Sequence, residues 1–109
     1  FRRMHGGRPW LADTRHKTFK ATARALERAF GAKTALIREG GSIPFVRTIA
    51  DILGSPCLLL GFGLPNDNPH APNEWLDIEN ARLGTKACAI LYDELSRALA
   101  GDAKRRARA

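Results

Sequence analysis

A single histidine lies in the middle of a polar segment, GLPNDNPHAPNEW, which covers residues 63–75. Proline has no N–H to donate, and Asn and Asp side chains compete for the backbone, so this segment is predicted to be a loop. A neutral imidazole is the commonest protein ligand of zinc, which makes His70 a candidate metal ligand. The alternative is a loop histidine bonded only to the backbone, because one ligand does not make a metal site. His5 and His16 lack ligand spacing to His70, and no HExxH motif is present, so further ligands would have to come from outside this chain.

The second candidate for chemistry is the stretch REGGSIP, residues 38–44. A strand is predicted to end there and a helix to begin, and N–H groups at a helix N-terminus attract a carboxylate or another anion. Glu39 could hold an ammonium group, Gly41 frees the backbone, and Ser42 could cap the helix or donate its hydroxyl to a ligand. The alternative is a tight turn with a serine cap and a surface glutamate, since paired glycines alone are weak evidence.

The elements that would position these loops follow from hydrophobic spacing. Apolar residues with a helical period predict helices over residues 17–30, 44–53 and 76–99, with Gly31 and Gly54 as the stops of the first two. The apolar runs at 34–38 and 56–62 predict buried strands. The order α-β-α-β-α predicts an α/β fold, a three-layer fragment with short parallel strands. Ligands gather at the carboxyl ends of parallel strands, so both loops are expected at one edge.

Charge and cysteine content restrict the function classes. The net charge is +7 in 109 residues, but it lies at the ends: residues 1–20 carry +5, residues 102–109 carry +3, and the middle carries −1. This distribution argues against a nucleic-acid-binding fold, although basic ends can attract polyanions. Cys57 and Cys88 lie in apolar stretches and predict buried thiols in a reducing, cytoplasmic compartment, with a disulfide as the alternative. No apolar run approaches the roughly 20 residues of a membrane span.

Three stretches together resemble a known family. HGGRPWLAD, ARALERAFGAKTALIREGGSIPFV and GFGLPNDNPHAPNEWLDIENARLGTKACAILYDEL are similar, in order and spacing, to the C-terminal part of the catalytic domain of M20 zinc metallopeptidases. The dipeptidase branch of that family, which contains the carnosine-type enzymes, is the most similar, because both REGGSIP and the HxxNE loop match it. The resemblance covers about residues 5–97.

The resemblance implies a domain organisation. The catalytic domain of this family is discontinuous, because an inserted lid domain, which also forms the dimer, separates its two parts. Residues 1–15 would be the exit from the lid, residues 16–99 the C-terminal segment of the catalytic domain, and residues 100–109 a basic, disordered tail. The remainder of the catalytic domain and the lid would be partners of this chain, and the full-length form would be a homodimer.

The resemblance also implies a function. Members of the family hydrolyse an amide bond of a dipeptide or an N-acyl amino acid with two zinc ions, with manganese as the alternative metal. His70 matches the one metal ligand that this segment supplies and also borders the substrate. Glu39, Gly41 and Ser42 match the substrate-binding turn. The other ligands and the catalytic base belong to the N-terminal part, so this chain contains no catalytic residue and is expected to be inactive alone.

Two alternative interpretations, in which the chain is not part of an enzyme, remain open. The chain could be a binding module whose basic ends contact polyanions or an acidic partner, which would give a steep salt dependence of binding. It could also be a dimerisation module that pairs exposed strand edges with a second copy.

Overall fold

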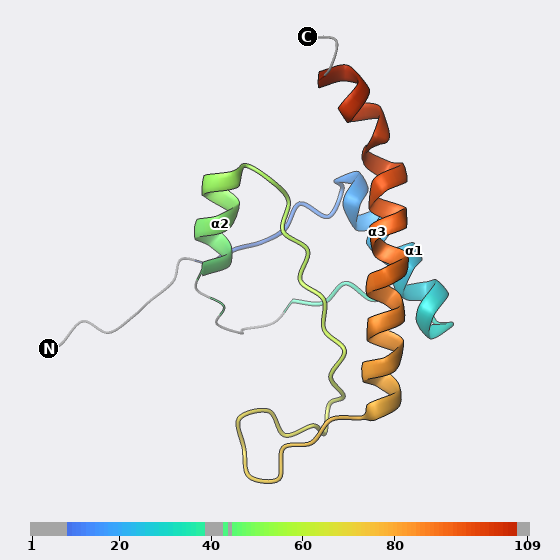
Figure 1. Cartoon of the computed structure of the whole chain (residues 1–109). Coiled ribbons are helices and arrows are strands. Elements are labelled where there is room, and N and C mark those ends of the chain that lie inside the picture. Colours follow the sequence, from blue (N-terminus) through green and yellow to red (C-terminus); the bar gives the residue numbers. More distant parts are fainter. Residues whose placement is uncertain (1–8, 39–42, 44, 107–109) are drawn as a thin grey trace, which may run out of the picture.

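The structure is a computed structural model that describes residues 9–38, 43 and 45–106, and for residues 102–106 it describes the backbone alone. Its elements are, in order, α1 (Lys17–Phe30), α2 (Phe45–Leu53) and α3 (Ile78–Arg106). Figure 1 shows α1 and α3 side by side, with α2 on the other side of the molecule and extended connections between them. Among the described helices, only α1 and α3 pack against each other.

The ends of α1 and α2 follow from local chemistry. His16 is extended at the N-cap of α1, where its Nδ1 accepts a hydrogen bond of 3.3 Å from the Thr18 N–H. Gly31 ends α1 with φ at +70°, and its N–H donates to the Glu27 carbonyl. Gly54 follows α2 in the same left-handed conformation, with φ at +57°. Glycine adopts this conformation without a steric penalty, so the predicted stops at both glycines are confirmed.

The core between α1 and α3 is made of small side chains. Its buried apolar members are Ala21, Ala25 and Ala29 on α1 and Ala87 on α3, and Gly84 of α3 is buried as well. Small residues let two helix backbones approach closely, and each one buries little apolar area. Phe30 of α1 stacks on Phe62 at 5.9 Å between ring centroids, which extends this core to the segment that precedes α3.

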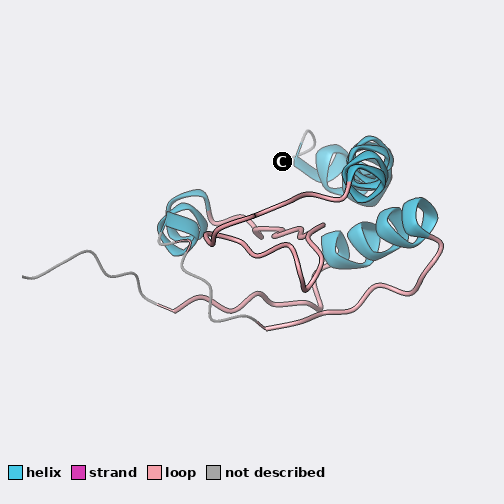
Figure 2. Cartoon of the chain, turned by 90° about the horizontal axis from the view of Figure 1, so that it is seen from below, coloured by secondary structure: helices cyan, strands magenta, loops and turns pink. Residues whose placement is uncertain are grey.

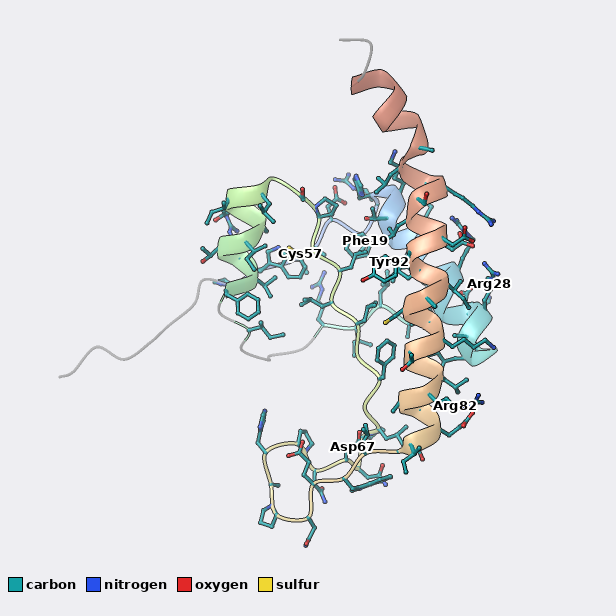
Figure 3. The ribbon with its side chains drawn as sticks, in the orientation of Figure 1. Phe19, Arg28, Cys57, Asp67, Arg82 and Tyr92 are labelled. Atoms are coloured by element: carbon teal, nitrogen blue, oxygen red, sulfur yellow. The ribbon has the colours of Figure 1, made fainter. Side chains whose placement is uncertain are left out.

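A carboxylate on α3 joins the two helices. Glu94 is 7% exposed, and its two oxygens accept hydrogen bonds from Arg24 at 2.8 Å and Arg28 at 3.0 Å. Both arginines come from α1 and remain about half exposed, and Arg28 is visible beside α3 in Figure 3. The buried carboxylate is therefore fully paired, so a charge that would be costly alone is compensated.

We predict that Glu94→Gln lowers the free energy of unfolding at neutral pH and that this difference disappears in acid. The hydrogen bond from Arg24 in the folded state lowers the pKa of Glu94 below its ordinary value of 4.5, with a further contribution from Arg28. A carboxyl whose pKa is lower when folded adds stability above the unfolded pKa and loses it as the pH falls through the folded pKa. Urea unfolding of both proteins, followed by circular dichroism between pH 7 and pH 2, measures the difference. A difference that stays constant over this range would contradict the prediction.

The predicted α/β three-layer fold with parallel strands is wrong. Within residues 9–38, 43 and 45–106 the structure contains helices and loops but no strand, as Figure 2 shows. The Cα atoms extend over 53 × 43 × 18 Å, whereas a sheet between two helix layers, each spaced by roughly 10 Å, would need more than 20 Å in its thinnest direction. The three helices themselves were predicted correctly, although α3 continues to Arg106, past the predicted end at residue 99.

The strand prediction was wrong because apolar composition does not provide a hydrogen-bonding neighbour. Residues 33–38 and 55–63 are non-helical, and no backbone hydrogen bond joins them in the structure as described. Their apolar side chains are largely in solvent: Leu36 is 66% exposed, Ile37 72% and Leu59 53%. A strand is defined by its ladder to a second strand, which neither segment forms here.

Cys57 and Cys88 are both free thiols and both half-buried, so they do not form the alternative disulfide. None of the described helices is both long and apolar enough to cross a lipid bilayer.

Candidate functional site

The loop that carries His70 connects the extended segment at residues 55–63 to α3, and Asp67 closes its base. Oδ2 of Asp67 accepts a hydrogen bond of 2.7 Å from the Leu64 N–H, and the Asp67 N–H donates to the Leu64 carbonyl at 3.1 Å. On the opposite side, the Trp75 N–H donates to the Asp67 carbonyl at 3.1 Å. Figure 3 shows Asp67 at the neck of the loop, where the chain enters and leaves. One residue thus fixes both ends of the loop.

Two further side chains hold the neck. The Trp75 indole Nε1 donates to the Asn66 carbonyl at 2.7 Å. Asn80, in the first turn of α3, donates from Nδ2 to the Phe62 carbonyl at 2.6 Å. Asp77 caps α3 by accepting from the Asn80 N–H at 2.6 Å. The Asn80 bond ties the residue just before the loop to the first turn of α3, so the loop starts and ends beside the start of that helix.

The tip of the loop is built from residues in the left-handed conformation. His70 has φ at +63°, Asn68 at +51° and Asn73 at +59°. Asn and His are among the non-glycine residues that tolerate this region best, which explains the polar composition of the loop. The His70 N–H donates to Oε2 of Glu74 at 3.3 Å, so this carboxylate holds the backbone of the histidine.

The structure places His70 as an exposed side chain at the tip of the loop. Within the described residues its imidazole makes no hydrogen bond, and both ring nitrogens are open to a partner. The same residues contain no group of three His, Cys, Asp or Glu side chains that could hold a metal ion. By themselves the described residues do not complete a zinc site, because zinc takes three or four ligands from protein and no three of these side chains come together.

The three other predicted site residues, Glu39, Gly41 and Ser42, lie outside the described residues. The structure therefore does not test whether their turn meets the His70 loop. Arg38, which directly precedes the turn, and Ile43, within it, are both exposed.

Two shallow cavities lie away from His70. One, of about 210 Å³, lies between the end of α1 and the start of α3, and its lining includes Phe30, Thr34, Phe62 and Asn80. The other, of about 230 Å³, is lined by residues that include Trp10, Phe19 and Cys57. Neither lining includes a residue that the sequence analysis singled out as a substrate or metal contact.

Sequence reasoning missed Asp67 and the role of Trp75. The signal was present in the run Pro-Asn-Asp-Asn, which is typical of a turn whose Asp side chain bonds to nearby backbone N–H groups. The structure also explains Gly63, because a Cβ atom there would lie 3.0 Å from Oδ2 of Asp67. The glycine leaves room for the carboxylate.

Comparison with known proteins gives a consistent set of relatives. Residues 1–94 match the family described as peptidase family M20/M25/M40. The chain is 35% identical over 96 residues to a Cys-Gly metallodipeptidase of Schizosaccharomyces pombe, which covers 88% of the chain and 20% of that protein. It is 38% identical over 86 residues to a Cys-Gly metallodipeptidase of Saccharomyces cerevisiae, which covers 79% of the chain and 18% of the relative. It is 30% identical over 91 residues to the human Beta-Ala-His dipeptidase, which covers 84% of the chain and 18% of the relative. The chain therefore spans about a fifth of the length of these relatives.

Proposed function

Because the chain belongs to peptidase family M20/M25/M40, we propose that it works as the C-terminal segment of the catalytic unit of a metallopeptidase. The substrates are dipeptides or N-acyl amino acids, and the bond cleaved is an amide. The metal is a pair of zinc ions, with manganese as the alternative. The names of the relatives, Cys-Gly metallodipeptidase and Beta-Ala-His dipeptidase, favour the dipeptide class.

The observation that supports this proposal most is that the His70 side chain is free while the loop that carries it is held by hydrogen bonds. Its imidazole is exposed and without a hydrogen bond in the described part of the chain, whereas the backbone around it is fixed by Asp67, Glu74 and Trp75. A free imidazole on a fixed loop suits a ligand whose companions come from another part of the enzyme, because the loop need not reorganise to bind.

In this proposal the chain contributes one ligand and part of the substrate pocket. When bound, the metal pair would supply Lewis-acid chemistry for an amide carbonyl and an activated water. His70 would hold one metal and border the substrate. Glu39, Gly41 and Ser42 form the turn that contacts the ends of the substrate, as the family resemblance implies.

The proposal also includes the domain organisation of the enzyme and the cellular compartment in which it works. Residues 1–15 lead from a lid domain, residues 16–99 complete the catalytic domain, and residues 100–109 form the basic end. The enzyme acts as a homodimer through its lid. The free thiols of Cys57 and Cys88 are consistent with work in the reducing cytoplasm.

We predict that the 109-residue chain alone neither hydrolyses dipeptides nor binds zinc tightly, because it lacks the other ligands and the general base. The test is to purify the chain and to assay Cys-Gly, β-Ala-His and an N-acyl amino acid with zinc or manganese. Isothermal titration with zinc chloride gives the affinity. The complete peptidase that carries this segment is assayed in parallel and should hydrolyse at least one of these substrates. Turnover by the pure chain, or a tight complex with one zinc per chain, would contradict this prediction.

A further inference from the structure

Two carboxylates are buried in the described part of the chain, and they differ in how they are paired. Both oxygens of Glu94 bind arginines, as expected for a structural ion pair. Asp67 is 9% exposed, and no ion pair with a described cation is seen. Its Oδ2 accepts from the Leu64 N–H, but its Oδ1 is buried without a hydrogen-bond partner among the described residues. A buried polar atom without a partner is costly and rare, so its retention needs an explanation.

The position of Asp67 supplies that explanation. It lies three positions before His70, and its hydrogen bonds fix the residue that enters the loop, Leu64, and the residue that leaves it, Trp75. Gly63 leaves the space that the carboxylate occupies, since a Cβ atom there would meet Oδ2 at 3.0 Å. The carboxylate is thus built into the neck of the loop.

We propose that Asp67 is a positioning residue for His70. Oδ2 and the main chain of Asp67 close the neck of the loop, and Oδ1 accepts one further N–H or O–H donor when the loop is engaged in the complete catalytic unit. This inference rests on the proposed function, because it takes His70 to be a metal ligand. Asp67 itself touches neither metal nor substrate in this proposal.

The physical basis is preorganisation. The imidazole of His70 is exposed and makes no hydrogen bond with the described residues, so its position depends on the backbone of residues 64–75. Opening the neck would free the loop ends, and metal binding would then carry the entropy cost of closing the loop again. Groups that orient a metal ligand by bonding to it typically change metal affinity or activity about 10–100-fold when removed, and we expect the same range for Asp67, which acts through the backbone.

The test uses Asp67→Ala and Asp67→Asn in the complete peptidase, with Asp93→Ala as the matched control. Asp93 is an exposed acid on α3 whose partner, Arg97, is also exposed. Metal affinity is measured by competition with a chromophoric chelator, and kcat and KM are measured separately. Hydrogen exchange of the Leu64 amide, measured by NMR on the 109-residue chain, reports the neck directly.

Asp67→Ala should bind zinc about 10–100-fold more weakly, with rapid exchange of the Leu64 amide, whereas Asp93→Ala should behave as wild type. Asparagine can still accept from the Leu64 N–H, but it places an NH₂ group where Oδ1 lies. Asp67→Asn should therefore keep the Leu64 amide protected and still lose metal affinity. Should Asp67→Ala unfold the protein, the asparagine variant still decides the outcome.

Wild-type metal affinity in both Asp67 variants would overturn the inference. Wild-type affinity in Asp67→Asn alone would overturn the role of Oδ1. A His70→Asn variant separates this failure from failure of the proposed function. If His70→Asn binds metal as well as wild type, the proposed function fails; if it loses metal and the Asp67 variants do not, only the positioning role fails.

Discussion

Replacing His70 by asparagine in the complete peptidase is expected to lower kcat/KM for its dipeptide substrate by at least about a thousandfold. The estimate follows from magnitudes: residues that only orient a ligand cost about 10–100-fold, so removal of the ligand itself should cost more. Asparagine tests the imidazole more specifically than alanine does, because His70 has φ at +63° and asparagine tolerates that conformation. The loop backbone is then preserved, and the imidazole alone is lost. Steady-state kinetics at saturating metal, together with the metal content of the purified enzyme, measure the effect.

The matched control for this experiment is Asn68→Gly. Asn68 lies in the same loop with φ at +51°, and glycine accepts this angle without strain. The change removes a polar side chain close to His70 and keeps the Asn68 carbonyl that accepts from the Ala71 N–H. We expect it to change kcat/KM by no more than a few-fold. Comparable losses in both variants would mean that the loop, rather than the imidazole, is what matters, and near-normal activity of His70→Asn would contradict the metal-ligand role.

The loop and the helices differ from the strands in how far sequence alone could predict them. Helix bonds and glycine caps are local, so the spacing of apolar residues and the two glycines, Gly31 and Gly54, were sufficient to locate α1 and α2. Strands depend on a neighbour that is distant in sequence. The apolar run at residues 56–62 predicted burial on two faces, but the described chain offers no second strand to pair with it.

The candidate site shows the same division. Proline and asparagine content predicted the loop around His70, because turn chemistry is local. The burial of Asp67 could not be predicted, since it depends on where Trp75 and the start of α3 return to the neck of the loop. An acidic residue in a polar segment is ordinarily exposed to solvent. Asp67 is buried only because the two ends of the loop come together around it.

Gly84, in the second turn of α3, gives a second large expected effect, this time on stability. In an open helix, Gly→Ala stabilises by about 1 kcal/mol, because alanine has the higher helix propensity. At Gly84, however, an added Cβ would lie 2.8 Å from Cδ2 and 2.9 Å from Cγ of Phe62. These are ring atoms, and the ring is itself stacked on Phe30, so it cannot swing aside as a flexible chain end would. Overpacking of this kind costs about 1–3 kcal/mol, so we expect Gly84→Ala to be destabilising overall.

Gly101 provides the comparison within the same helix, because a Cβ atom there would meet nothing within 4 Å. Gly101→Ala is therefore expected to stabilise the chain by up to about 1 kcal/mol, limited by fraying near the end of α3. Urea unfolding of the two variants and the wild-type chain, followed by circular dichroism, should give shifts of opposite sign. A stabilising Gly84→Ala would mean that Phe62 can leave its position between Phe30 and α3. In that case Phe62 could not hold the segment before the His70 loop against the start of α3.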